Sequence, residues 1–176
     1  MLRGRYFFAL WPELEVRRQL AEEARQFDVA GRRHHPMDLH MTLVYLGQVA
    51  ESRMRCIEEV AEGIVGRAFT LQIDGIGYWS RPRILWAGPR ETPEPLAQLV
   101  FDLQQGLGDC GFESERRRYK PHVTLYRKSG ATDPMVIAPA VSWPVGEFVL
   151  AVSGLNKPGE PRYRILKRWQ LSGDAG

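Results

Sequence analysis

The sequence is poor in cysteine and histidine and has no long apolar run. Its two cysteines, Cys56 and Cys110, stand in no Cys-x-x-Cys pair and in no spacing typical of metal ligands. We therefore expect two free thiols, buried or half-buried, in a reducing compartment. The apolar stretch at residues 6–10 is too short for a membrane span or for the core of a signal peptide, and no small-residue cleavage site follows it. These features predict a cytoplasmic protein that is not bound to a membrane.

Neither sign of charge dominates the composition. Charged residues make up 26% of the chain and the formal net charge is only +3, but Arg greatly outnumbers Lys. Arg suits paired hydrogen bonds to phosphate and stacking on bases. The composition is therefore compatible with a nucleic-acid partner, and equally with ordinary solvated arginines.

The 176 residues, 44% of them hydrophobic, are typical of one compact domain with a real core. Apolar periodicity and the positions of Pro and Gly predict alternating helices and strands, with a segment broken by Pro at residues 132–144. We expect strands over residues 6–10, 39–46, 69–73 (continuing in broken form to 79), 84–87, 122–127, 147–155 and 163–171, and helices over residues 12–27, 51–65 and 94–107.

The order of these elements repeats weakly. Each half of the chain has a strand, a helix, a strand that begins with His, and a later strand at a similar spacing. This repeat predicts a single domain over residues 1–176, made of two similar lobes with pseudo-two-fold symmetry. The fold class is α+β, with largely antiparallel sheets lining a central cleft and helices packed outside.

The most informative feature is a phrase that occurs twice, His40-Met41-Thr42-Leu43 and His122-Val123-Thr124-Leu125. The chain has only four His and five Thr, so a random arrangement would give roughly 0.1 His-x-Thr triplets. We interpret the two phrases as the two halves of one active site.

Strand geometry explains why the phrases suit catalysis. Side chains alternate between the two faces of a strand, so His and Thr share one face and the apolar residues take the other. Two imidazoles across a cleft can supply a base and an acid on opposite sides of a phosphorus atom, without a metal. The hydroxyls of Thr42 and Thr124 can donate to the non-bridging oxygens.

Two other roles for the histidines are compatible with single motifs. Each His could be a satisfied polar residue on a structural strand, although the matched pair argues against this. A zinc site would need a third ligand, and no Cys or carboxylate stands at a suitable spacing from either motif. The neighbours His34 and His35, just before Pro36, are expected in a solvated loop.

The sequence resembles the 2H phosphoesterase superfamily, and more narrowly the bacterial and archaeal RNA 2′,3′-cyclic phosphodiesterases, also called 2′-5′ RNA ligases. The likeness covers nearly the whole chain. It rests on residues 5–10, 38–43 with 46–47, 121–127, and 163 with 166–169, which look like the family's opening strand, its two motifs and its closing strand.

The resemblance implies hydrolysis of RNA 2′,3′-cyclic phosphate ends to 2′-phosphates, and in some members the joining of tRNA halves, without a cofactor or metal. It implies that His40 is the proton donor and His122 the proton acceptor, and that Thr42 and Thr124 bind the phosphate. Two alternatives stay open: a hydrolase of small cyclic nucleotide phosphates, and a module that binds RNA ends without turnover. Nothing indicates an obligate oligomer, and we expect a monomer.

Other residues are weaker candidates for substrate contact. Arg127 matches a family Arg, but strand alternation places it opposite His122 and Thr124 unless a bend or bulge follows Leu125. The resemblance suggests that Phe8 packs against a base, while burial in the core is the plainer alternative. Residues 116–118, three arginines, form either a patch for the RNA backbone at the cleft mouth or a solvated loop. Trp79 and Trp143 could stack on bases, but packing is the expectation for both.

Overall fold

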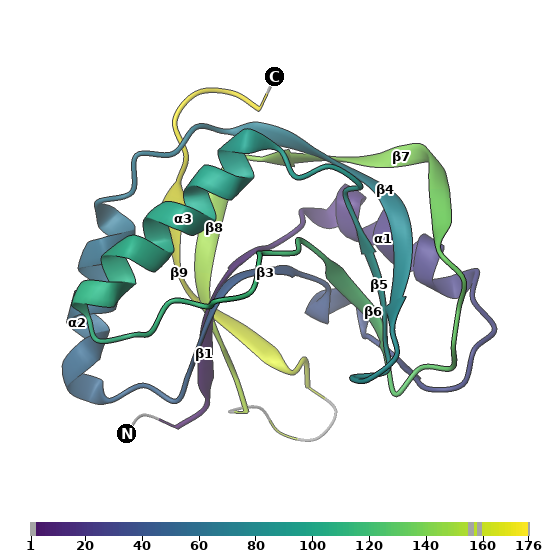
Figure 1. Cartoon of the computed structure of the whole chain (residues 1–176), viewed down its shortest axis with the longest axis horizontal. Coiled ribbons are helices and arrows are strands. Elements are labelled where there is room, and N and C mark those ends of the chain that lie inside the picture. Colours follow the sequence, from purple (N-terminus) through teal and green to yellow (C-terminus); the bar gives the residue numbers. More distant parts are fainter. Residues whose placement is uncertain (1–2, 155–156, 158–159, 176) are drawn as a thin grey trace.

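A computed structural model describes residues 3–154, 157 and 160–175. Within these residues, three α-helices and one short 3-10 helix surround a single nine-stranded sheet (Figure 1). No described helix has the length and apolar character needed to cross a bilayer. The strands are β1 (Arg5–Leu10), β2 (Arg32–Arg33), β3 (Met41–Gly47), β4 (Phe69–Trp79), β5 (Ile84–Gly88), β6 (Val123–Arg127), β7 (Met135–Val145), β8 (Glu147–Ser153) and β9 (Tyr163–Gln170), and the helices are α1 (Leu14–Arg25), η1 (Pro36–Asp38), α2 (Glu51–Glu62) and α3 (Glu94–Asp109).

The strand order reveals the symmetry of the sheet. It runs β7-β4-β5-β6-β3-β1-β8-β9, every neighbouring pair is antiparallel, and β2 pairs with β6 off this path. Counting outward from the joint between β6 and β3, β5 corresponds to β1, β4 to β8 and β7 to β9. The predicted α+β class with a largely antiparallel sheet is confirmed. One half of the sheet comes from both ends of the chain and the other half from its middle.

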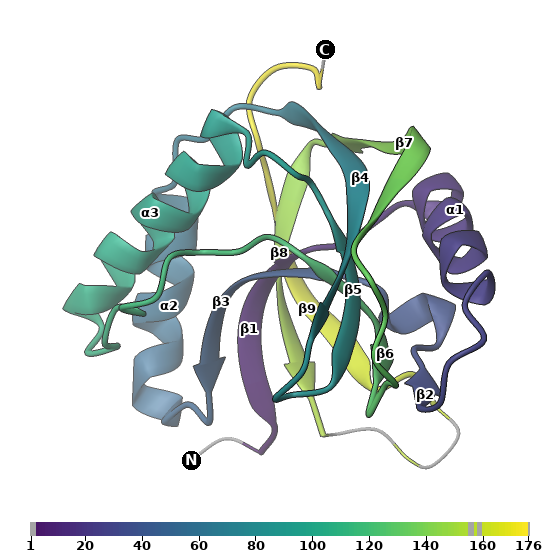
Figure 2. The same ribbon diagram turned by 45° about the vertical axis from the view of Figure 1, so that its right-hand side comes forward.

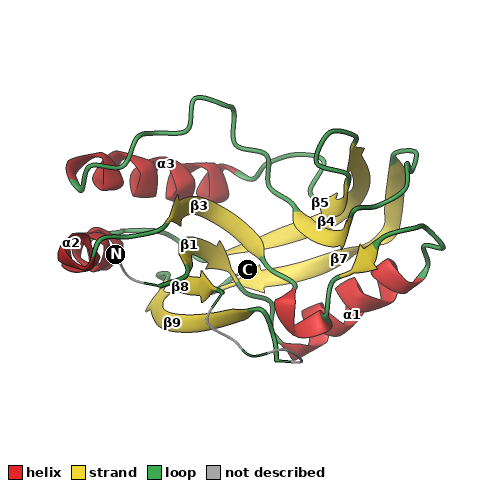
Figure 3. Ribbon diagram, turned by 90° about the horizontal axis from the view of Figure 1, so that it is seen from below, coloured by secondary structure: helices red, strands yellow, loops and turns green. Residues whose placement is uncertain are grey.

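The helices cross over between the halves. Helix α1 follows β1 but packs against β6 and β7, whereas α3 follows β5 but packs against β3, with α2 beside it. Figures 2 and 3 show α1 at one end of the molecule and the pair α2 and α3 at the other. Each half of the sheet is therefore covered by a helix that belongs, by chain order, to the other half.

Phe8 and Trp143, two aromatic residues considered above as candidates for contact with a base, lie in the core. Phe8 is fully buried and packs against Phe148 and Trp169, with ring centroids 6.1 and 5.8 Å away. The expectation that Phe8 contacts a base is therefore wrong, because its side chain lies on the core face of β1. Trp143 is only 2% exposed, which confirms packing as its role.

The segment broken by Pro forms a strand, which the sequence did not predict. Residues 135–145 are β7, paired along most of their length with β4, and the Ala138–Pro139 peptide bond is cis. Strand β7 lies at the edge of the sheet. Prolines are tolerated there because an edge strand has one side without ladder hydrogen bonds. Strand β4 continues to Trp79 as expected, and its register with β7 shifts between Ile73 and Gly75, where the extra residues, 137–140, belong to β7.

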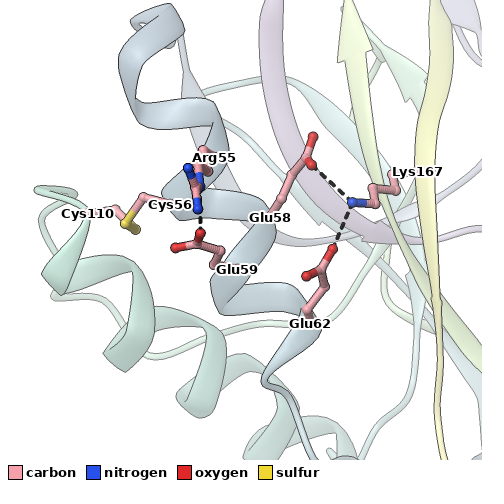
Figure 4. A network of polar contacts seen from close by, with 7 residues as sticks. All are labelled: Arg55, Cys56, Glu58, Glu59, Glu62, Cys110 and Lys167. Carbon is pink, nitrogen blue, oxygen red and sulfur yellow. Dashed lines mark hydrogen bonds and ion pairs between the residues drawn. A yellow bond between two sulfur atoms is a disulfide. The ribbon is translucent and has the colours of Figure 1, made fainter.

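The prediction of free thiols is also wrong. Cys56 on α2 and Cys110 at the end of α3 form a disulfide, with their Cα atoms 5.8 Å apart. Figure 4 shows the surroundings of this bond, where Lys167 on β9 forms ion pairs with Glu58 and Glu62 of α2. No local pattern indicates the pairing, since the two cysteines become neighbours only when α2 packs on α3. Helix α2 is thus held covalently to α3 and by charge to the sheet.

We expect the disulfide to add about 2–4 kcal/mol to the free energy of unfolding, because it closes a long loop in the unfolded chain. Urea unfolding of the oxidised protein should lose this amount on addition of dithiothreitol. The double variant Cys56→Ala, Cys110→Ala is the control and should unfold identically with and without reductant. Alkylation of two thiols in the non-reduced native protein would contradict the bond.

Candidate active site

The two His-x-Thr phrases meet at the joint between β3 and β6. Met41 pairs with Val123 across this joint, and both side chains are fully buried. His40, Thr42, His122 and Thr124 are half-buried on the opposite face. Continuing the antiparallel register by one residue in each direction sets His40 opposite Thr124 and Thr42 opposite His122. The two imidazoles are then diagonal neighbours on one face of the sheet.

Each phrase ends in a β-bulge, which lies at its Leu. The β1–β3 register shifts at Leu43, between Val44 and Thr42, and the β5–β6 register shifts at Leu125, between Tyr126 and Thr124. A bulge adds one residue to a strand and reverses the faces of the residues that follow. Leu125 and Tyr126 are consequently both buried.

The bulge at Leu125 places Arg127 on the face of the catalytic candidates. This removes the conflict with strand alternation, since Arg127 is half-buried on the side of His122 and Thr124. Its counterpart in the other half, five residues after His40, is Tyr45, which is 62% exposed beside Thr42. Tyr45 was missed by the sequence analysis, because alternation without a bulge sends it to the other face.

Backbone carbonyl groups fix the orientation of both imidazoles. His40 Nδ1 lies 2.7 Å from the carbonyl oxygen of Asp38, and His122 Nδ1 lies 2.8 Å from that of Lys120. A carbonyl oxygen only accepts hydrogen bonds, so Nδ1 is the protonated nitrogen of each neutral ring. Nε2 remains in both rings as the nitrogen that can take up or give a proton.

Aromatic rings enclose His40. Trp11 stacks on it at 4.8 Å with an interplanar angle of 9°, Phe7 lies at 5.0 Å, and Tyr163 contacts it edge-on at 4.7 Å. On the other side of the joint, His122 contacts Trp79 edge-on at 4.5 Å. Phe7, and not the predicted Phe8, contacts the site, because the sequence of β1 does not indicate which of its faces packs on the main core.

The protein environment disfavours a charged imidazole at both histidines. Burial lowers the pKa of His40 to about 4, and the positive charges of His122 and Arg127 act in the same direction. Burial also lowers the pKa of His122, with contributions from Arg127 and Lys120. Both rings are therefore neutral near pH 7 until an anion enters. Negative charge between them would raise both pKa values.

Asp38 links the His40 side of the site to β9. Its carboxylate is 3% exposed and accepts a hydrogen bond from the backbone N–H of Arg162 at 2.9 Å. That bond fixes the start of β9, where Tyr163 packs on His40. Burial raises the pKa of Asp38. The position of Asp38 two residues before His40 is the only signal in the sequence that could have indicated this role.

A groove of about 790 Å³ opens beside Thr42 and His122. Trp79 and the three arginines at residues 116–118 line it, and the arginines are exposed. The hydroxyl of Tyr119 donates to the carbonyl oxygen of Thr42 at 2.8 Å, so this loop is tied to β3 next to the motif. The arginines belong to an exposed loop at the edge of this groove, which is compatible with both alternatives named for them.

His34 is not the solvated residue that the sequence predicts. It is 7% exposed, and its Nε2 accepts a hydrogen bond from Nε of Arg127 at 3.1 Å. His35 is exposed, as expected. In the described part of the chain, no three His, Cys, Asp or Glu side chains gather as a metal site would require.

Comparison with known proteins gives a consistent result. The model of the 2′-5′ RNA ligase superfamily matches residues 10–156. The RNA 2′,3′-cyclic phosphodiesterase of Escherichia coli K12 is 35% identical over 173 residues, which cover 96% of this chain and 97% of that protein. The crystal structure of E. coli LigT complexed with 3′-AMP has a TM-score of 0.88 at 33% identity, covering 97% of this chain and 99% of the other. A further structure, titled as a phosphoesterase, has a TM-score of 0.89 at 33% identity with the same coverage.

Removing the stacked ring from His40 should raise its pKa. We expect Trp11→Ala to let water reach the imidazole, so that its pKa moves from about 4 toward the ordinary value of 6.5 while that of His122 changes little. The measurement is an NMR titration of the histidine Cε1 protons. Trp79→Ala is the matched control, and it should move His122 instead. A wild-type His40 that titrates near 6.5 would contradict this description of the site.

Proposed function

This chain belongs to the 2′-5′ RNA ligase superfamily, and we propose that it opens terminal 2′,3′-cyclic phosphates of RNA to leave 2′-phosphates. It is a phosphodiesterase by its relationship to proteins of that name. The observation that carries the proposed chemistry is the pairing of Met41 with Val123, because this pair brings the two His-x-Thr phrases to one face of the sheet.

In the proposed reaction His122 acts as the base and His40 as the acid. Nε2 of His122 takes a proton from water, and the water oxygen attacks phosphorus. The bond from phosphorus to the 3′-oxygen breaks, and protonated Nε2 of His40 gives its proton to that oxygen. The products are a 2′-phosphate and a free 3′-hydroxyl. The backbone hydrogen bonds to Nδ1 support this scheme, since they hold both Nε2 atoms ready for transfer.

The remaining polar groups would hold the phosphate. The hydroxyls of Thr42 and Thr124 donate to the two non-bridging oxygens, which carry the developing negative charge. Arg127 adds a full positive charge from the same face, and its guanidinium suits two parallel hydrogen bonds to phosphate.

The two histidines lie in nearly equivalent positions, so the surroundings of each ring must decide which one acts as the acid and which as the base. Family resemblance makes His40 the acid, yet burial of its more enclosed ring lowers its pKa to about 4. The scheme therefore requires that the bound phosphate raise this pKa enough to protonate His40. The substrate itself would then create the acid that it needs.

The groove beside His122 supports RNA as the substrate class. The arginines at residues 116–118 would contact phosphates upstream of the reacting end, and Trp79 offers a ring for a base. We further propose that residues 1–176 form one catalytic domain of two similar lobes, acting as a monomer in the cytoplasm, with RNA ends such as those of tRNA halves as substrates. Ligation would use the same site: the 5′-hydroxyl of a second RNA would attack phosphorus in place of water, the bond to the 3′-oxygen would break, and a 2′-5′ linkage would form.

The first test is a product assay. A short RNA ending in a 2′,3′-cyclic phosphate is incubated with the protein in excess EDTA, and the products are separated against 2′- and 3′-phosphate standards. We expect a 2′-phosphate from the wild type, and a rate at least about 100-fold lower from His40→Ala and His122→Ala, since each removes one proton-transfer group. Circular dichroism should show that both variants are folded.

Other outcomes of the assay have distinct meanings. Inhibition by EDTA, or a full rate from either variant, would contradict the two-histidine mechanism. Turnover of a small cyclic nucleotide in preference to RNA would assign a different substrate. Tight RNA binding without turnover would make the protein a binding module.

The pH dependence should differ between kcat/KM and kcat. Above the pKa values of both free histidines, the fraction of enzyme with one protonated ring falls tenfold per pH unit, and kcat/KM should fall with it. Bound phosphate raises the pKa values, so kcat should stay high to a higher pH than kcat/KM. Initial rates from pH 4.5 to 9 measure both profiles. Identical alkaline limbs would show that the substrate does not change the protonation of the site.

A further inference from the structure

The short strand β2 has no counterpart in the symmetric strand order. It pairs with the end of β6, where Arg32 faces Arg127 and Arg33 faces Tyr126. The next residue, His34, donates its backbone N–H to the carbonyl oxygen of Leu125, the residue of the bulge, at 2.8 Å. Gly31 permits this approach, because a Cβ there would lie 2.8 Å from the carbonyl oxygen of Arg127. Strand β2 therefore braces the bulge that directs Arg127 to the catalytic face.

The side chain of His34 continues this support. Its Nε2 accepts the hydrogen bond from Nε of Arg127 at 3.1 Å. A guanidinium only donates, so Nε2 must carry a lone pair and Nδ1 the hydrogen. Nδ1 is buried and finds no hydrogen-bond partner among the described residues. The imidazole is neutral, in accord with burial and the charge of Arg127, which lower its pKa to about 3.

A neutral acceptor has a specific advantage at this position. It fixes Nε of Arg127 while leaving the whole positive charge, and both terminal nitrogens, for another ligand. A carboxylate would hold the guanidinium more strongly but would cancel its charge. The unpaired Nδ1–H is unfavourable for folding, so stability alone does not account for a histidine here.

We propose that His34 is a positioning residue, which holds Arg127 toward the scissile phosphate without neutralising it. This inference rests on the proposed function in one respect, namely that Arg127 contacts the phosphate. On this proposal, β2 is the element that makes one half of the near-symmetric site differ from the other. The corresponding position to Arg127 in the first half is Tyr45, which is not braced by any such strand in the described chain.

The test is a set of variants at His34 in two backgrounds. His34→Leu keeps the volume but removes the acceptor, and we expect kcat/KM to fall about tenfold with no decrease in Tm. His34→Gln places an oxygen near the position of Nε2 and should remain within about threefold of the wild type. His34→Asn is the matched control, since its shorter amide does not reach Arg127, and it should resemble His34→Leu.

The second background is Arg127→Ala. If His34 acts through Arg127, adding His34→Leu to Arg127→Ala should not change kcat/KM further. A full additional loss in that background would overturn the proposal. So would wild-type activity of His34→Leu, or a lowered Tm in His34→Leu together with no recovery in His34→Gln.

A charged acceptor gives a signature that a structural role would not produce. The groups that face His34 are Arg127, His40, Arg162 and Arg32, three cations and one catalytic imidazole. His34→Glu should cancel much of the charge of Arg127 and move the alkaline limb of kcat/KM to higher pH, because Arg127 lowers the pKa of both catalytic histidines. An unshifted limb would count against the proposal.

Binding of inorganic phosphate separates this inference from the proposed function. Calorimetry should give a weaker affinity for phosphate, by about tenfold, in His34→Leu than in the wild type, with His34→Gln close to the wild type. If the wild type opened no cyclic phosphate but this ranking held, the proposed function would fail and the role of His34 would stand. Equal phosphate affinities in an active enzyme would reject the role of His34 alone.

Discussion

The whole site depends on one narrow contact between two halves of the sheet. Strands β3 and β6 share only the pair Met41–Val123, yet each carries its His and Thr immediately beside this pair. The crossed helices strengthen the contact, since α1 packs on β6 and β7 while α3 packs on β3. The two imidazoles share one face of the sheet because helices packed on the other face hold the backbone on either side of a single residue pair.

The deviations from symmetry are as informative as the symmetry. Both halves use the same devices: a His with Nδ1 bound to a carbonyl group two residues earlier, a Thr two residues later and a bulge at the following Leu. They differ in the rings around each His and in the second residue after the bulge, which is Tyr45 in one half and Arg127 in the other. Hydrolysis needs one protonated and one neutral proton-transfer group. The differences around His40 and His122 are the features that could give the two imidazoles different protonation states.

The sequence predicted what depends on local patterns. The paired phrases, the alternation that puts Met41 and Val123 in the core, and most helices and strands follow from periodicity. It failed where a distant neighbour decides the outcome. Phe8 faces the main hydrophobic core and Phe7 faces the side of His40, and nothing within β1 itself decides which face is which. Cys56 meets Cys110 only across two packed helices, and His34 is buried only because β2 lies against β6. The sequence showed that Arg127 could reach the site only if a bend or bulge followed Leu125. Alternation alone could not show whether the bulge exists or at which residue it lies.

The interleaving of the chain has a consequence for synthesis. Strand β1 lies between β3 and β8, so the first half of the sheet stays incomplete until the C-terminal strands β8 and β9 have been made. Tyr163, which closes the ring cage on His40, arrives with the last strand. A nascent polypeptide on the ribosome therefore contains both histidines long before it contains a working catalyst, and activity can begin only after translation has passed β9.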